Sequence, residues 1–203
     1  MKIYETKLAP NPRRVRIFIA EKGIENIEYV ELDIQKGENL SKDFRAKNPL
    51  AKVPVLELDD GQCLSETVAI CRYFEALNGA VPLMGISAWE QAHIEMWNRR
   101  MELSFFYPVA MAFRHTSGYF SDREEVHRAW GESNKVIAEK QFLFLNKHLA
   151  EHAFIAGEAY SIADITALCA VDFARVIGMK VGDELPNLQR WHQAMKARPS
   201  YTA

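Results

Sequence analysis

The sequence predicts an α/β unit followed by an all-helical unit, and two observations support this division. In residues 1–78, short apolar-alternating runs are interleaved with amphipathic stretches, a pattern that is typical of strands and helices in alternation. Residues 79–85 resemble a linker, and after them the chain shows helical periodicity without a strong strand signal. A chain of 203 residues is long enough to give both units a core.

The first unit is predicted to run strand, helix, strand, short helix, hairpin, helix. Strands are expected at residues 2–5 and 27–32, and a short helix at 41–46. Asn11 is a good N-cap and proline suits the first helical position, so the first long helix is expected to begin there. Gly23 is expected to end it, and the residues predicted to share its inward face are Val15, Phe18, Ile19 and Lys22.

A hairpin is predicted over residues 53–65, because two apolar-alternating runs flank an Asp-Asp-Gly turn signal. Pro54 cannot donate to a sheet ladder and therefore belongs at a strand start or edge. If the Val53–Pro54 bond is cis, the main-chain groups of Val53 face outward and can pair with an extended peptide. A helix follows at 66–77, whose free N–H groups attract a carboxylate; its predicted inward residues are Ile70, Cys71, Phe74 and Leu77.

The second half is predicted to consist of four helices. Residues 88–115 are expected to form one long helix that Pro108 kinks, and residues 122–149 form the next. Ser161 and Asp164 resemble a capping box and are expected to start a helix without any catalytic role. The last helix is expected at 188–197. The inward residues predicted behind the capping box are Ile165, Leu168, Cys169, Phe173 and Val176.

Composition excludes several classes of function. The formal net charge is −2, which gives no indication of binding to nucleic acid or an anionic membrane. No apolar run approaches the roughly 20 residues of a membrane span, and the first residues do not resemble a signal peptide. Cys63, Cys71 and Cys169 lack the spacing of a zinc site or a disulfide framework, so we expect buried thiols, no metal and a cytoplasmic protein.

Four motifs follow one another along the chain: PNPRRVR at 10–16, NPLAKVPVL at 48–56, SETVAI at 65–70 and SIADITA at 161–167. Together and in this order they resemble the cytosolic glutathione transferase family, and the first is similar to the helix start of bacterial and fungal members. The resemblance implies a thioredoxin-like domain at 1–78, a linker at 79–86 and an all-helical domain at 87–203. It also implies glutathione as a co-substrate rather than a resident cofactor, and conjugation of its thiolate to a hydrophobic electrophile held between the domains.

The resemblance also assigns the glutathione contacts. Val53 pairs through its main chain with the cysteinyl unit, and Glu66 with Thr67 holds the γ-glutamyl head. Lys52 faces the glycine carboxylate, and Asn39 is a weaker partner there. The residues expected to bind glutathione are Asn11, Asn39, Lys52, Val53, Pro54, Glu66 and Thr67.

The residue that activates the thiol is less clearly indicated. A free thiol has a pKa of about 8.5, so the family usually supplies Tyr, Ser or Cys just before the first helix. Here the serine position falls on Ala9 and the cysteine position on Asn11. Asn11 is the first candidate, because its amide can donate at the positive end of a helix, although a capping role explains it equally well. His115 is the second. The expected hydrophobic site comprises Leu8, Tyr107, Met111, Arg114 and His115.

Two alternatives to conjugation remain open on the sequence. One is glutathione peroxidase chemistry, whereas thiol transfer is disfavoured because position 9 is alanine and position 11 is asparagine. The other is a non-catalytic interaction module, which Ala9 favours, because fold does not fix function. The resemblance further implies a homodimer that acts in detoxification.

Overall fold

The computed structural model describes residues 1–77, 79 and 81–203, which form two compact units. The first unit is Met1–Pro82 together with Pro199–Ala203, and the second is Leu83–Arg198. The division falls inside the predicted linker, whereas Asn78, the predicted end of the first domain, lies outside the described residues.

The sequence did not predict that the C-terminal residues group with the first unit. Arg13 explains part of this grouping, because its Nη2 donates to the Tyr201 carbonyl over 3.3 Å and its guanidinium lies 4.9 Å from the Tyr201 ring centroid. Ser200 donates its hydroxyl to Glu21 at the other end of the same helix. The 3₁₀ turn Pro199–Thr202 is thereby tied to the helical layer of the first unit.

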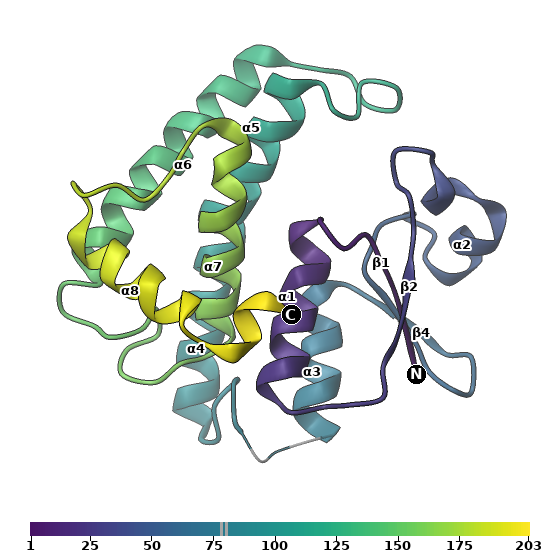
Figure 1. Cartoon of the computed structure of the whole chain (residues 1–203), viewed down its shortest axis with the longest axis horizontal. Coiled ribbons are helices and arrows are strands. Elements are labelled where there is room, and N and C mark those ends of the chain that lie inside the picture. Colours follow the sequence, from purple (N-terminus) through teal and green to yellow (C-terminus); the bar gives the residue numbers. More distant parts are fainter. Residues whose placement is uncertain (78, 80) are drawn as a thin grey trace. The chain divides into compact units, whose positions relative to one another are not determined.

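Four strands form one mixed sheet in the first unit, and the predicted fold class is confirmed there (Figure 1). The order is β2-β1-β3-β4, with β1 parallel to β2 and the other two pairs antiparallel. Ile3 lies opposite Leu56 in the register, and both side chains are fully buried. The strands are β1 (Lys2–Glu5), β2 (Glu28–Glu31), β3 (Val55–Glu57) and β4 (Cys63–Ser65).

The helices of the first unit are α1 (Pro10–Glu21), α2 (Lys42–Lys47) and α3 (Thr67–Leu77). In Figure 1, α1 and α3 lie together on one face of the sheet and α2 lies on the other side. The inward face predicted for α1 is confirmed, and the buried ammonium of Lys22 pairs with Glu75 at 2.6 Å. The prediction for Leu77 is wrong: it is 57% exposed, because α3 ends there beyond the edge of the core.

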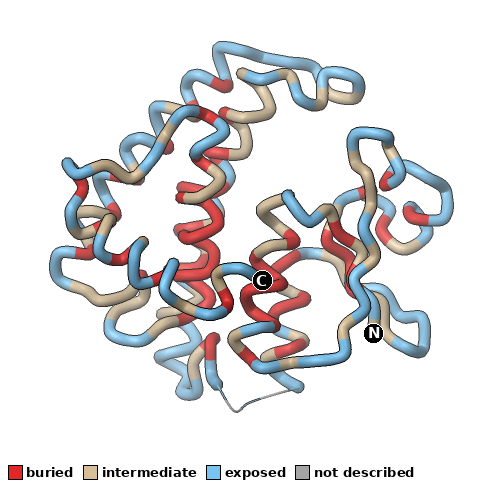
Figure 2. The backbone as a smooth tube through the Cα atoms, in the orientation of Figure 1, coloured by how far each residue is buried: buried red, intermediate tan, exposed pale blue. Residues whose placement is uncertain are grey.

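The second unit contains helices and no β-strand in the part that the structure describes, as predicted. One helix, α7, is buried along most of its length (Figure 2), because both faces of it are apolar and other helices surround it. The helices are α4 (Ala88–Arg100), α5 (Tyr107–Ser117), α6 (Arg128–His148), α7 (Ile162–Phe173) and α8 (Pro186–Lys196).

The helical run predicted at 88–115 is continuous from Ala88 to Ser117, but it contains a π-helical turn that the sequence did not predict, and one boundary predicted for this unit is wrong. The π turn, Met101–Phe106, ends one residue before the Tyr107–Pro108 step. Proline offers no N–H to the preceding turn, and a π turn is one way in which a helix accommodates that loss. The helix predicted at 122–149 begins only at Arg128, because residues 118–127 form a loop.

The predicted capping box at the start of α7 is confirmed. Ser161 accepts a hydrogen bond from the Ala163 N–H at 3.3 Å, and the Ser161 N–H donates to the Asp164 carboxylate at 3.0 Å. Asp164 also accepts bonds from the Ile155 N–H and from the indole N–H of Trp191, each at 2.9 Å. One buried carboxylate therefore connects the start of α7 to a loop and to α8.

Two burial predictions need correction. Val176 is 49% exposed, because α7 ends at Phe173 and Val176 lies in the following 3₁₀ turn, with its side chain toward solvent. Cys63 lies on the exposed edge strand β4, whereas Cys71 and Cys169 are buried as expected; all three are free thiols.

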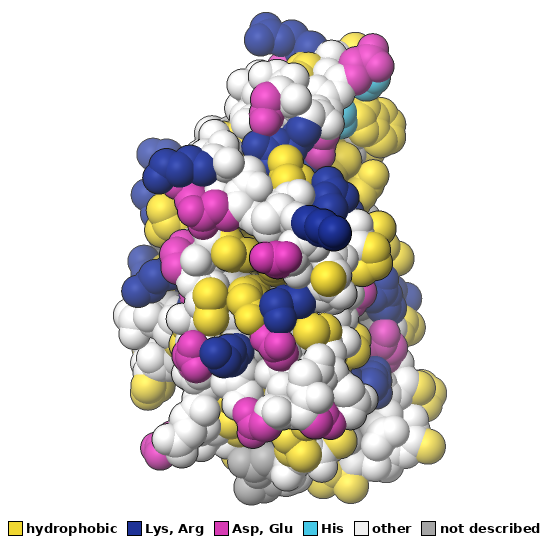
Figure 3. Space-filling view, turned by 90° about the vertical axis from the view of Figure 1, so that its right-hand side faces the viewer, with side chains coloured by type: hydrophobic (Ala, Val, Ile, Leu, Met, Phe, Trp, Pro, Cys, Tyr) yellow, Lys and Arg dark blue, Asp and Glu magenta, His cyan; other side chains and the backbone are white. Residues whose placement is uncertain are grey.

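None of the described helices is both long and apolar enough to span a membrane. Basic and acidic side chains are interspersed on the face drawn in Figure 3.

Candidate functional site

The register of the sheet brings three candidate segments to one end of it. β3 runs antiparallel to both β1 and β4, with Val55 opposite Tyr4 on one side and Ser65 on the other. The entry to β3, the exit from β1 and the exit from β4 therefore leave the sheet at the same end. Those segments carry Val53, the start of α1 and the start of α3.

Two buried asparagines support the loop that enters β3. Asn48 donates from Nδ2 to the Lys52 carbonyl at 2.8 Å and accepts from the Leu50 N–H at 3.1 Å. Asn39 donates from Nδ2 to the Ala51 carbonyl at 2.7 Å. Ala51 has a left-handed backbone, φ 53°, which the two side-chain bonds on either side of it hold in place. The loop is thus built from side-chain contacts rather than from a sheet ladder.

Val53 follows this loop and offers a free main-chain edge. The Val53–Pro54 peptide bond is cis, as the sequence argument supposed, and Pro54 directly precedes β3. Within the described residues, the N–H and C=O of Val53 have no hydrogen-bond partner. Such a pair of groups can bind an extended peptide as a short added strand.

The start of α3 offers a second set of donors. Glu66 is exposed and has a left-handed backbone, φ 71°, that turns the chain sharply from β4 into the helix. Thr67 is the first helical residue, and in the described part of the chain neither its N–H nor its hydroxyl has a partner. The N-terminus of a helix attracts an anion through its free N–H groups and its dipole. A carboxylate would therefore bind here.

Lys52 and Asn39 differ in what they can offer a second carboxylate. The Lys52 side chain is exposed and has no ion-pair partner among the described residues. Asn39 is only 8% exposed, and its amide nitrogen is already bonded to Ala51. The structure gives Asn39 a role in holding the loop, while its contact with glutathione stays a prediction.

The start of α1 differs from the prediction. The N-cap is Ala9, which has no side-chain cap, and Asn11 is the second helical residue. Capping is dispensable here because Pro10 and Pro12 have no N–H groups, so the first turn has fewer donors to satisfy. The capping interpretation of Asn11 is therefore wrong, and its N–H has no acceptor within the described residues.

Arg14 orients the Asn11 side chain. Its Nη1 donates to the Asn11 Oδ1 over 3.4 Å, and Arg14 is 2% exposed. The amide oxygen of Asn11 therefore accepts from Arg14, and the side-chain NH₂ of Asn11 remains as a donor beside the backbone N–H of the same residue. Both donors lie at the positive end of α1, where an anion such as a thiolate is stabilised.

The hydroxyls near the end of β1 are already engaged. Tyr4 donates to Glu57 at 2.5 Å, and this bond raises the pKa of the Tyr4 phenol. Thr6 donates to the Leu32 carbonyl at 2.7 Å. Neither hydroxyl is therefore available to a thiol without breaking a bond, which leaves Asn11 as the better candidate in the first unit.

In the helical unit, two candidates on α5 hold the loop that follows it. Arg114 forms an ion pair with Glu124 and lies 4.4 Å from the ring centroid of Phe120. His115 accepts at Nδ1 from the His127 N–H over 3.2 Å. Both side chains have structural partners, and a contact with substrate stays a prediction for each.

The remaining residues of the expected hydrophobic site are accessible. Tyr107 and Met111 lie one turn apart on α5, the former 49% exposed and the latter partly buried. Leu8 belongs to the first unit and is 95% exposed in the turn before α1. An apolar side chain exposed to this extent is free to contact an apolar ligand.

Sequence reasoning missed two residues that shape the site, Asn48 and Arg14. Asn48 precedes a proline, and asparagine commonly bonds to the backbone two residues further on, so this local role was detectable. The bond from Arg14 to Asn11 spans one helical turn and was also within reach of the sequence, since residues three apart are neighbours on a helix.

Comparison with known proteins identifies the same family that the four sequence motifs resemble. Family profiles described as glutathione S-transferase N-terminal domain and C-terminal domain match residues 9–77 and 106–199. Glutathione S-transferase 2 of Saccharomyces cerevisiae is 36% identical, over 98% of this chain and 87% of that protein. A crystal structure of a glutathione S-transferase domain-containing protein from Marinobacter aquaeolei has a TM-score of 0.92 and 38% identity, and the match covers 99% of this chain and all of that one.

A relative of a different kind also matches. A probable elongation factor 1-gamma of Arabidopsis thaliana is 32% identical over 90% of this chain, but the match covers only 45% of that longer protein.

Proposed function

Since the chain belongs to the glutathione S-transferase family, as its sequence predicts, we propose that it binds glutathione on its first unit and conjugates it to a hydrophobic electrophile. The observation that carries this proposal is the pairing, at one end of the sheet, of a free main-chain edge at Val53 with a free helix start at Thr67. A peptide that carries an α-carboxylate complements both.

The proposed reaction forms one C–S bond. The glutathione thiol releases its proton, and the thiolate attacks an electrophilic carbon with its electron pair. A halide leaves with the bonding pair, or an epoxide oxygen takes that pair and then a proton. The protein contributes by binding the peptide and stabilising the thiolate, which lowers the pKa of the bound thiol.

Asn11 is our candidate for stabilising the thiolate. Removing its NH₂ with Asn11→Ala should lower the rate of conjugation and raise the pKa at which bound glutathione ionises, because a donor aimed at the anion is lost. A lost oxyanion-hole donor costs about 2.7–4 kcal/mol elsewhere. We expect less here, because the dipole of α1 and the Asn11 N–H remain.

The measurement is the pH dependence of conjugation for the wild type and the variant. Ala9→Gly is the matched control, since it alters the same helix start without removing a polar group, and it should leave rate and profile nearly unchanged. If Asn11→Ala changes neither rate nor profile, Asn11 has no part in activation, and His115→Gln becomes the next variant.

The second candidate function is a non-catalytic interaction module. Ala9 supports it, as does the similarity to an elongation factor 1-gamma, a protein more than twice as long as the matched region. A screen with aryl halides, epoxides, isothiocyanates and hydroperoxides distinguishes the possibilities. Turnover of any of the first three supports conjugation, turnover of hydroperoxides alone supports peroxidase chemistry, and glutathione binding without turnover supports the module.

We also propose that the protein is a cytoplasmic homodimer that acts in detoxification. Three free cysteines suit a reducing compartment. Large apolar side chains seven residues apart, Trp89, Met96 and Leu103, are 76%, 38% and 57% exposed along α4 and the π turn after it. This stripe is the surface that we expect a second copy to cover, with the first unit of one subunit against the helical unit of its partner.

A further inference from the structure

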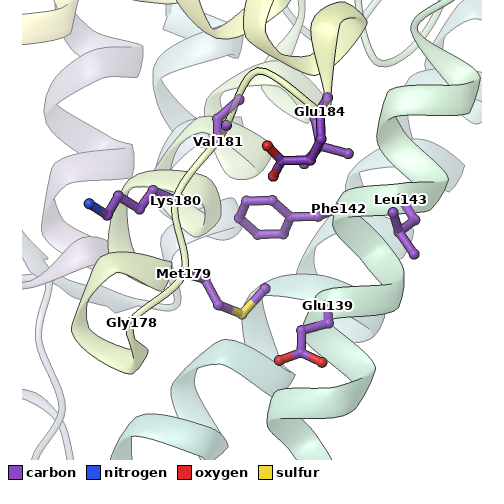
Figure 4. A pocket seen from close by; sticks show the side chains of 10 residues that line it. Glu139, Phe142, Leu143, Gly178, Met179, Lys180, Val181 and Glu184 are labelled. Carbon is purple, nitrogen blue, oxygen red and sulfur yellow. The ribbon is translucent and has the colours of Figure 1, made fainter.

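A second free main-chain edge lies in the helical unit, in the segment 178–185 that leads into α8. Between this segment and α6 is a cavity of about 470 Å³ (Figure 4). The cavity belongs to the helical unit alone, so what it binds does not depend on glutathione or on the first unit. Its lining is mostly apolar, and the large apolar side chains in it are Phe142, Leu143, Met179, Val181 and Leu185.

The edge is formed by residues 179–182, which belong to no helix, strand or turn. Met179 points into the cavity whereas Lys180 points away from it (Figure 4), and this alternation is that of an extended strand. Within the described residues, the N–H and C=O groups of Lys180 and Val181 and the N–H of Gly182 have no hydrogen-bond partner. An extended peptide can add to such an edge as one more strand.

The apolar surface beside this edge suits one side chain of such a peptide. Leu143 on α6 is 63% exposed, and Met179 and Val181 are partly buried. Phe142 is only 4% exposed, so it supports these residues from within the unit and offers little surface of its own. A peptide leucine that covered Leu143 and Met179 would remove apolar area from water, which is favourable in proportion to that area.

The charges around the cavity are mainly negative. Glu139 and Glu184 lie on opposite sides of Phe142 and Met179 (Figure 4), and neither carboxylate has a hydrogen bond or an ion pair within the described part of the chain. Lys180 is the only basic residue that the described chain contributes to the lining, and its ammonium group points away. Basic residues on both sides of an apolar anchor would therefore meet a carboxylate at each end.

We propose that this surface binds an extended segment of a partner protein, in which an apolar residue has a basic residue two positions before it and another two positions after it. Residues two apart lie on one face of a strand, about 6.6 Å from each other, so the three side chains project together. The peptide main chain pairs with residues 180–182, the apolar residue contacts Leu143 and Met179, and the basic residues reach Glu139 and Glu184. A small apolar molecule or a helix would leave the main-chain edge unpaired.

Four peptides test this assignment in titrations of the ¹⁵N-labelled full chain, followed by the backbone amide signals of residues 179–182. Acetyl-Lys-Thr-Leu-Thr-Lys-amide, the lysine peptide, should shift these signals. Replacing its leucine by alanine should weaken binding at least about fivefold, because apolar contact is lost. Replacing both lysines by glutamines should weaken it about threefold to tenfold. Methylating the nitrogens of the three central residues removes main-chain donors and should weaken it about threefold to tenfold.

Variants of the protein identify the groups responsible. Leu143→Gln should weaken the lysine peptide about fivefold. Val176→Gln is the matched control, because Val176 is 49% exposed just before this segment and does not line the cavity. Glu139→Gln and Glu184→Gln should each weaken the lysine peptide about twofold to fivefold and leave the glutamine peptide unaffected. All four positions are exposed, so the variants should fold, and equal melting temperatures would establish this.

The proposal is overturned if the lysine peptide leaves the amide signals of residues 179–182 unchanged, or if the methylated or the glutamine peptide binds as tightly. Equal effects of Leu143→Gln and Val176→Gln also overturn it. Shifts of the same signals when the protein alone is diluted would show that a second copy occupies this surface instead, and would overturn it too. None of these titrations contains glutathione, so their outcome is independent of the proposed conjugation.

Discussion

Two capping boxes in the helical unit differ in burial, and this difference predicts the effect of removing each serine. Ser161 begins α7 and is fully buried, whereas Ser87 begins α4 and is exposed; both accept a bond from a backbone N–H of the first turn. Ser161→Ala and Ser87→Ala are therefore the same chemical change in two environments.

The expected magnitudes follow from what replaces the lost hydroxyl. At Ser87, water can replace the hydroxyl, so the free energy of unfolding should fall by about 0.5–1 kcal/mol, the lower part of the range for a lost N-cap. At Ser161, no water reaches the Ala163 N–H, and a buried unsatisfied N–H costs about 1–3 kcal/mol. The weaker bond from Ser161 Oγ to Asp164, at 3.4 Å, is lost as well. We expect about 2 kcal/mol for Ser161→Ala.

Urea denaturation followed by circular dichroism measures both free energies, and calorimetry should show a melting temperature about 2–4 °C lower per kcal/mol for a chain of this size. The reasoning requires Ser161→Ala to cost at least about 1 kcal/mol more than Ser87→Ala. Equal losses at the two sites would refute it, because burial would then not determine the strength of the cap.

Two further predictions concern pH and assembly. Burial raises the pKa of Asp164 from 3.8 to about 6, so the folded protein keeps this proton over a range in which the unfolded chain releases it. The resulting stabilisation is complete below pH about 4 and is lost as the pH rises through about 6; relative to Asp164→Asn, the wild type should lose about 3 kcal/mol of unfolding free energy between these limits. Parallel pH profiles for the two proteins would contradict this. Analytical ultracentrifugation at micromolar concentration should show a species of twice the 23.2 kDa chain mass, and Trp89→Glu should shift it toward monomer; a wild-type monomer would show that the exposed stripe on α4 does not pair.

Local patterns in the sequence were sufficient for most of the first unit. The hairpin, the short helix after Ser41 and the strand at 28–31 follow from turn residues, a cap and alternation within a few positions. The capping box of α7 was visible for the same reason. The sequence could not predict the hydrogen-bond partners of Asp164, because Ile155 and Trp191 approach it only through tertiary packing.

In the candidate site, too, features set by neighbouring residues were predictable and contacts between distant residues were not. The main-chain edge at Val53 and the helix start at Thr67 were predicted, because a proline and a turn determine them locally. The partners of Arg114 and Tyr4 were not, since Glu124 and Glu57 lie 10 and 53 residues away in the chain. The π turn before Pro108 was missed because a proline signals disruption without specifying its form.

Isothermal titration of glutathione into the wild type and Thr67→Val tests the central claim most directly, namely that the start of α3 holds a carboxylate of glutathione. The wild type should bind, and Thr67→Val should bind about 10- to 150-fold more weakly, which corresponds to the 1.5–3 kcal/mol of a hydrogen bond to a charged group. Thr202→Val, an exposed threonine at the C-terminus, should bind like the wild type. Equal affinity of the wild type and Thr67→Val, or no binding of glutathione by a folded wild type, would contradict the claim.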